Sequence, residues 1–421
     1  MNQRRNAIVA GILVIIGIFA AAWMMLPKSG DTGSNADNID TVSTATATPT
    51  PSASGDKTEY SVTAKEIALG DYDAGAVVKI SAGGEYVLSG EMTDGQIVVD
   101  VTDDEKVGLY LNNASITNPV GNAILVNNAD RVTITLSDDT SNAVTDGAKY
   151  SELDADGEPD SAIFSHDDLT INGNGALTVN ANYAGGIESR DDLKIAGGNI
   201  AIKAVTHGMF GNKSVEIKTA SVAITAGGDA IHSDGDMLIE SGTFALASDD
   251  DAMHADGTLT VSDGKIDITE SYEGIEATDV VINGGTIDIT ADDDGLNGAG
   301  GNDDNSNSPT TEGGRPRPGD NFSRTTGSIT ITGGAITIQA GISGNGDGLD
   351  SNGALTISGG DILIKEPATQ RDYSSIDYET TVSITGGQVR ILDTNGNYTT
   401  ITQENVGSAG MGGGFGGGRP R

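Results

Sequence analysis

Short stretches in which apolar and polar residues alternate recur along most of the chain. The unit around Met253 contains three of them, at 252–254, 259–261 and 265–269. Alternation at a period of two with β-branched residues is typical of strands, and the Asp-Gly, Ser-Gly and Asn-Gly-Gly sequences between the stretches are typical of turns. The pattern therefore predicts an all-β chain built from units of three short strands.

The units can be followed through one apolar anchor residue in each. Successive anchors are 24, 22, 22, 22, 22, 21, 53 and 27 residues apart, and the gap of 53 contains a polar insertion at 299–326. Three strands in about 22 residues are too few for a propeller blade of ~40–45 residues, but they suit one rung of a parallel β-helix. The anchors are Ile163, Ile187, Met209, Ile231, Met253, Ile275, Leu296, Leu349 and Ile376.

The amino-terminal segment has a different pattern. Arg4 and Arg5 precede an uncharged apolar run of 20 residues, Ala7–Leu26. This length matches the ~20 residues that cross a bilayer as a helix and exceeds the ~7–15 residues of an ordinary signal-peptide core. We expect a retained signal anchor over 1–28, with cleavage near Ala20–Ala22 as the alternative. In either case the remainder is predicted to lie outside the cytoplasm, on the outer face of the membrane or secreted.

Composition divides the rest of the chain. Residues 29–58 are rich in Ser, Thr and Pro, a composition that cannot bury a core and predicts a disordered linker. We expect irregular first coils and a cap over 59–146, and the regular β-helix over 147–405. The Gly-rich end, 406–421, is predicted to be a disordered tail.

The charge excludes several functions. The 421 residues include 61 acidic and 23 basic ones, so the net charge is −38. This charge argues against nucleic-acid binding, which needs clustered Lys and Arg to neutralise phosphates. The sequence contains no Cys, which excludes disulfide scaffolds and thiolate zinc sites.

Alignment on the anchors places most of the chemically distinctive residues in two columns, two positions before and one position after the anchor. Stacked ~4.8 Å apart, carboxylates would repel one another by roughly 1 kcal/mol even at a water-like dielectric, so such columns need cations. Many oxygen ligands without Cys indicate Ca²⁺; turn formation by single Asp residues is the alternative. The candidate metal ligands are Glu188, Asp229, Asp251, Glu273, Glu276, Asp294, Asp347 and Asp350.

Four other residues near the anchors are candidates for a role. His232 and His254 are expected to stack in adjacent rungs, as a surface ladder with satisfied hydrogen bonds or, alternatively, as a transition-metal pair. Tyr183 and Tyr272 stand shortly before their anchors, where a ring could lie under a sugar; the alternative is an exposed residue that only fills a turn.

Three stretches, 83–90, 168–179 and 192–198, together with the Asp-Gly-Ile type of rung, resemble a bacterial family of carbohydrate-binding, polysaccharide-lyase-like β-helix proteins. The similarity extends over about 59–402. It implies a right-handed parallel β-helix, bound calcium ions, and binding to cellulose and to acidic pectic chains.

These observations predict a monomeric, non-catalytic surface protein that binds polysaccharides in a Ca²⁺-dependent manner and contacts the membrane only through its amino-terminal helix. A calcium-dependent lyase is one alternative. It would need an Arg or Lys base beside the ion, but neither column contains a basic residue, and Arg190 and Lys213 are expected to lie beyond the columns. An adhesin or structural stalk is the other alternative.

Overall fold

The computed structural model describes residues 64–151, 153, 157, 159–299 and 327–408. Among these residues, no helix has both the length and the apolar character needed to cross a membrane. Several predicted segments fall wholly or largely outside the described residues: the anchor 1–28, the linker 29–58, the polar insertion and the end of the Gly-rich tail.

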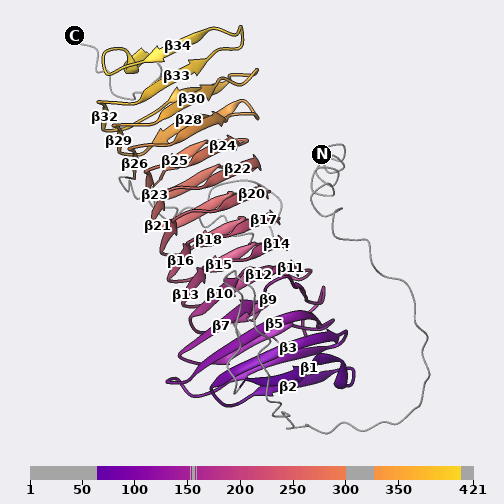
Figure 1. The fold of residues 1–421 in the computed structure, drawn as a ribbon. Coiled ribbons are helices and arrows are strands. Elements are labelled where there is room, and N and C mark those ends of the chain that lie inside the picture. Colours follow the sequence, from indigo (N-terminus) through magenta and orange to yellow (C-terminus); the bar gives the residue numbers. More distant parts are fainter. Residues whose placement is uncertain (1–63, 152, 154–156, 158, 300–326, 409–421) are drawn as a thin grey trace. The chain divides into compact units, whose positions relative to one another are not determined.

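The described strands stack in sequence order into three ladders, and each turn of the chain adds one strand to each ladder (Figure 1). All described pairings are parallel except the last, between β33 and β34. The first ladder carries the anchors. It consists of β2 (Ala76–Ile80), β4 (Gly95–Asp100), β6 (Ile124–Asn128), β9 (Ser161–Ser165), β12 (Gly185–Ser189), β15 (Met209–Gly211), β18 (Ile231–Ser233), β21 (Met253–Val261), β23 (Ile275–Ile282), β25 (Leu296–Gly298), β28 (Asn345–Ser351) and β31 (Asp372–Ile376).

Some long strands belong to two ladders: β21 and β23 run through the first and second ladders, and β5 (Lys106–Thr117) runs through the second and third. The second consists of β1 (Lys65–Ala68), β3 (Gly84–Met92), β5, β7 (Arg131–Leu136), β10 (Leu169–Gly173), β13 (Asp192–Ile195), β16 (Ser214–Ile217), β19 (Asp236–Ile239), β21, β23, β26 (Ser328–Ile331), β29 (Ala354–Ile357) and β32 (Thr381–Ile384). The third continues from β5 through β8 (Ser141–Thr145), β11 (Ala176–Asn180), β14 (Asn199–Lys203), β17 (Ser221–Ala226), β20 (Thr243–Ser248), β22 (Lys265–Glu270), β24 (Thr286–Thr290), β27 (Ala335–Gln339), β30 (Asp361–Lys365), β33 (Gln388–Leu392) and β34 (Tyr398–Ile401). Two 3₁₀ turns, Leu69–Asp71 and Val406–Ser408, complete the described elements.

The register of the first ladder confirms the repeat. Met209 pairs with Ile231, Ile231 with Met253, and Met253 with Ile275, so each step is 22 residues. Leu296 pairs with Leu349 across the polar insertion. The protein is therefore an all-β parallel solenoid, as the sequence predicts.

The core is a set of apolar ladders that run through the interior of the solenoid. Met253 in the first ladder, Leu259 in the second and Ile266 in the third are all completely buried. Alternating side chains point outward, because successive residues of a strand face opposite sides. Each rung thus buries three short apolar faces against the rungs on either side.

The position just before the anchor must be small, and this explains the Asp-Gly-Ile type of motif. A Cβ on Gly274 would lie 2.4 Å from the carbonyl oxygen of Gly295 in the next rung, and a Cβ on Gly295 would lie 2.6 Å from that of Gly348. Ala230 and Ala252 occupy the same position in earlier rungs and are completely buried. This close backbone approach keeps the residues on either side of it in register.

Candidate functional site

The first ladder brings the two predicted columns together in space. The first column is defined by the residues two positions before each anchor, at the start of or just before the strand. The second is defined by the residues one position after, within the strand. Asp229, Asp251, Glu273, Glu276 and Asp294 all belong to the columns, and each of them is at most 7% exposed. Carboxylates this deeply buried need partners of opposite charge or strong hydrogen bonds.

Backbone amides provide one such partner for the first column. The amide of Asp251 donates to Oδ1 of Asp229 at 3.0 Å, and the amide of Glu273 donates to Oδ1 of Asp251 at 3.1 Å. The amide of Asp347 donates to Oδ1 of Asp294 at 2.5 Å. Each of these carboxylates therefore uses one oxygen to bind the next rung. The other oxygen is left for the second column or for a cation.

An oxygen-rich group lies toward the carboxyl-terminal end of the columns. Asp294, Asp347 and Asp350 each place a carboxylate oxygen within 4.8 Å of the others. Asn297, which pairs in register with Asp350, has a buried Oδ1 without a hydrogen-bond partner. We call these four residues the oxygen cluster. The three converging carboxylates are a donor set that suits a hard divalent cation, and Asn297 adds an unpartnered amide oxygen in the neighbouring rung of the same column.

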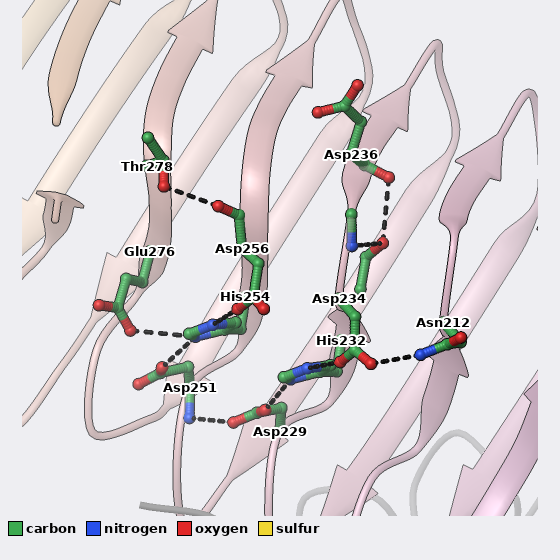
Figure 2. A network of polar contacts seen from close by, with 12 residues as sticks. Asn212, Asp229, His232, Asp234, Asp236, Asp251, His254, Asp256, Glu276 and Thr278 are labelled. Atoms are coloured by element: carbon green, nitrogen blue, oxygen red, sulfur yellow. Dashed lines mark hydrogen bonds and ion pairs between the residues drawn. The ribbon is translucent and has the colours of Figure 1, made fainter. Parts of the chain in front are cut away.

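Histidines occupy the middle of the columns. The rings of His232 and His254 are parallel within 1°, with centroids 4.8 Å apart, which confirms the predicted stacking. The expectation that they lie on the surface is wrong, because both side chains are largely buried among the column carboxylates, at 16% and 10% exposure. Figure 2 shows that acidic side chains surround both rings, with Nδ1 of His232 2.6 Å from Oδ2 of Asp229.

The structure also brings together Asp251 and Glu276, two of the candidate metal ligands, but around an imidazole. Nδ1 of His254 lies 3.2 Å from Oδ2 of Asp251 and 3.0 Å from Oε2 of Glu276 (Figure 2). Glu273 instead accepts a hydrogen bond from Nδ2 of Asn297 at 2.8 Å. The carboxylates of the middle rungs therefore face nitrogen as well as oxygen.

Glu188 has one partner in the preceding rung and another two residues further along its own chain segment. Its Oε2 accepts a hydrogen bond from Ser161 at 2.6 Å, and its Oε1 lies 3.5 Å from Nη1 of Arg190. The guanidinium of Arg190 also lies 5.8 Å from the centroid of the Phe210 ring. The expectation that Arg190 lies beyond the columns is therefore wrong, because its long side chain folds back onto the second column.

The two candidate tyrosines have different surroundings. Tyr183 is half-buried and stacks on Tyr150, with ring centroids 4.4 Å apart. Tyr272 is 46% exposed and directly precedes Glu273 of the first column. Of the two, Tyr272 offers the more accessible ring beside the columns.

Comparison with known proteins identifies the family of the chain. Residues 74–314, more than half of the chain, match the family model described as carbohydrate-binding domain-containing protein. The chain belongs to this family. The matched range includes the histidines of the columns and Asp294, and it ends before Asp347 and Asp350.

Two relatives are similar to parts of the chain. A carbohydrate-binding domain-containing protein of Acetivibrio thermocellus is 45% identical over 128 residues, which are 30% of this chain and 45% of the relative. The match thus spans less than half of that relative. A solved structure of a polysaccharide lyase-like protein from C. thermocellum, a gadolinium derivative, is 36% identical and covers 52% of this chain and 86% of its own, with a TM-score of 0.43.

Burial, reinforced by neighbouring carboxylates, disfavours ionisation in the oxygen cluster of this carbohydrate-binding domain protein. Burial and the nearby Asp350 raise the pKa of Asp294 to about 9. Burial, with Asp350 adding to it, raises the pKa of Asp347 to about 7, and burial together with Asp377 raises that of Asp350 to about 6. Without a cation these side chains hold protons at pH values where free aspartates are ionised, so a divalent cation would replace the protons and offset the cost of the buried charges.

In the histidine rungs, the surrounding carboxylates favour the charged form of the side chain and raise the histidine pKa values. Burial alone would lower the pKa of His232, but hydrogen bonds with Asp229 and Asp234 outweigh burial and raise it to about 9. Burial likewise opposes ionisation of His254, but Asp251, Asp256 and Glu276 raise its pKa well above the usual range. Positive imidazoles therefore neutralise part of the negative charge in the middle of the columns. The oxygen cluster, in contrast, contains no positively charged residue.

Proposed function

We propose that this chain is a non-catalytic polysaccharide-binding protein whose contact with acidic glycans, such as pectic chains, depends on Ca²⁺. The observation that carries the proposal is the oxygen cluster, in which Asp294, Asp347 and Asp350 converge within 4.8 Å. Membership of the carbohydrate-binding domain family supports a polysaccharide as the ligand.

Electrostatics explains why a cation would be needed. The chain carries a net charge of −38, and polyuronates are also anionic. Screening over ~8 Å at physiological salt weakens this repulsion at a distance but does not remove it at contact. Ca²⁺ takes 6–8 oxygen ligands, so an ion held by three carboxylates and Oδ1 of Asn297 would keep positions open for a uronate carboxylate.

Of the eight metal ligands expected from the sequence, we place the calcium-dependent contact at Asp294, Asp347 and Asp350. Asp229, Asp251 and Glu276 each contact an imidazole nitrogen, which suits a softer cation than Ca²⁺. The other two, Glu188 and Glu273, are already engaged by side-chain hydrogen bonds from Ser161 and Asn297.

Retention of the protein on insoluble polygalacturonate and on cellulose tests the proposal. In EDTA, retention on polygalacturonate should be lost, while any retention on cellulose should persist because a neutral glycan has no carboxylate to bridge. The double variant Asp347→Asn/Asp350→Asn should lose polygalacturonate in the same way. The matched control is Asp267→Asn/Asp288→Asn, which removes two exposed carboxylates from the third ladder. Undiminished polygalacturonate retention in EDTA by folded protein would refute the bridge.

The exposed ring of Tyr272, beside the columns, would bind a neutral sugar by stacking against it. We expect Tyr272→Ala to weaken binding to cellulose about 2- to 10-fold, because aromatic contacts contribute roughly 0.5–1.5 kcal/mol. Tyr398→Ala is the control, since Tyr398 is 60% exposed on β34 at the far end of the solenoid. Binding isotherms measure the difference, and equal effects of the two substitutions would remove Tyr272 from the site. Tyr183, stacked on Tyr150, is the second candidate for such a contact.

Arg190 is the observation that favours a lyase as the second candidate, because it is a basic residue in contact with the second column. Five register steps along this column separate Glu188 from Asn297, which lies in the nearest rung of the oxygen cluster. At ~4.8 Å per step, the carboxylate that Arg190 contacts lies about 24 Å from the cluster. One uronate unit cannot contact both, so we favour binding without cleavage. Release of unsaturated uronate from polygalacturonate would reverse this choice, and failure to bind any glycan would favour the adhesin or stalk.

We also propose that the coil is right-handed and the protein monomeric, and that residues 1–28 hold it on the outer face of the cell membrane. The apolar run Ala7–Leu26 supports the anchor, and the Ser/Thr/Pro-rich residues 29–58 would act as a spacer. Membrane fractionation of cells that make the full chain is the direct test of the anchor.

A further inference from the structure

The middle of the columns repeats one arrangement of side chains in two successive rungs. In each rung a histidine has a column carboxylate three residues before it and a second carboxylate two residues after it. In the first of these rungs, Nδ1 of His232 faces Asp229 at 2.6 Å, while Nε2 lies 3.1 Å from Oδ1 of Asp234 (Figure 2). The outer carboxylate therefore fixes the ring so that Nδ1 points at the column.

A third donor comes from the preceding rung. His207 belongs to the first column, one rung before Asp229, and its buried Nδ1 has no hydrogen-bond partner. This nitrogen lies 3.4 Å from Oδ2 of Asp229. Ligand atoms from His207, Asp229 and His232 all lie within 4.8 Å of one another. Two ligands bound tetrahedrally at ~2.0–2.1 Å stand roughly 3.3–3.4 Å apart, so His207 and Asp229 already have the spacing of a metal pair.

The chemistry of these donors differs from that of the oxygen cluster. Two imidazole nitrogens and one carboxylate oxygen suit Zn²⁺ and similar transition metals, whereas Ca²⁺ prefers oxygen. Histidines that bind metals almost always give their other ring nitrogen to a carboxylate or carbonyl. Asp234 contacts His232 in this way, and Nδ2 of Asn212 in turn donates to Oδ2 of Asp234 at 2.5 Å.

We propose that His207, Asp229 and His232 form a binding site for a divalent transition metal of the Zn²⁺ class, separate from the oxygen cluster. Three protein ligands leave a fourth position for water or a ligand oxygen. The site links two rungs, because His207 and Asp229 belong to successive turns of the solenoid. It does not depend on the proposed binding of acidic glycans through Ca²⁺.

Calorimetric titration of the full-length chain with Zn²⁺, without a polyhistidine tag and in excess Ca²⁺, tests the site. We expect saturable binding of Zn²⁺ that loses one equivalent per chain in His207→Ala. Asp234→Asn should retain the ligands and weaken binding about 10- to 100-fold, as loss of a partner behind a ligating histidine does. His166→Ala is the matched control, because His166 is exposed and packs edge-on against Phe164 in an earlier rung. Co²⁺ in place of Zn²⁺ should give the intense visible absorption of tetrahedral coordination in the wild type and not in His207→Ala.

Two results would overturn the proposal: absence of saturable Zn²⁺ binding in excess Ca²⁺, or the same stoichiometry and affinity in the wild type and His207→Ala. The side chain of His207 is 32% exposed, so its replacement should not unfold the protein, and thermal melting checks this directly. If His207→Ala nevertheless unfolds, Asp234→Asn decides: tenfold or greater weakening supports the site, and unchanged affinity refutes it.

Discussion

Removal of Ca²⁺ at pH 8 is expected to lower the melting temperature of the protein by roughly 8 °C. A ligand that binds only the folded state at a thousandfold excess over its Kd contributes about 4 kcal/mol, and each kcal/mol corresponds to about 2 °C in a chain of this size. The physical reason is the convergence of Asp294, Asp347 and Asp350, whose repulsion Ca²⁺ would neutralise. Thermal melting in EDTA and in millimolar Ca²⁺ measures the shift, and equal midpoints at pH 8 would contradict calcium binding.

The effect should depend on pH in a defined direction. The folded-state pKa values of Asp294, Asp347 and Asp350 are about 9, 7 and 6, all above the usual value of 3.8. Protonated side chains therefore stabilise the metal-free protein fully below about pH 4, and this stabilisation is lost as the pH rises through about 6 to 9. The difference between Ca²⁺ and EDTA should thus be larger at pH 8 than at pH 5.

The double variant Asp347→Asn/Asp350→Asn sharpens this test because it should act in opposite directions in the two buffers. In EDTA it should melt above the wild type, since two repelling charges are gone. In Ca²⁺ it should melt below the wild type, since the ion has lost two charged ligands. The control Asp267→Asn/Asp288→Asn should shift both curves alike, because these exposed residues lie outside the columns.

Replacement of His254 by glutamine should destabilise the protein by about 3–5 kcal/mol, the usual cost of removing one partner from a buried ion pair. Nδ1 of His254 contacts both Asp251 and Glu276, so the substitution leaves two buried carboxylates without their positive partner. Denaturant unfolding in EDTA, which removes any contribution from bound metal, measures the loss. His166→Gln is the control, and it should change stability little because His166 is exposed.

A second substitution distinguishes lost charge from lost packing. Adding Glu276→Gln to His254→Gln should recover part of the stability, because it removes one of the two unpaired carboxylates. If the double variant is as unstable as the sum of the two single variants, the histidine contributes through packing alone and the ion-pair explanation is wrong.

The amino-acid sequence alone was enough to establish the repeat, the anchors and the two columns. The reason is geometric: in a parallel solenoid, residues one repeat apart become direct neighbours, so Met209, Ile231 and Met253 can be stacked by counting. The same rule placed His232 against His254 and Asn297 against Asp350. Family membership was also within reach, because the repeated motifs extend over most of residues 59–402.

What only the tertiary structure decided is the direction and the partner of each side chain. Register says that His254 and Glu276 are neighbours, but the torsions of the two side chains determine that Nδ1 of His254 meets both Glu276 and Asp251. Backbone amides that bind the first column belong to the turns, whose geometry the repeat does not specify. Contacts between residues that are not equivalent in the repeat, such as Arg190 with Glu188, were missed because they depend on long side chains rather than on rung spacing. The pattern of the chain thus determined which residues share a rung or a column, and the packing of side chains determined which of their atoms meet.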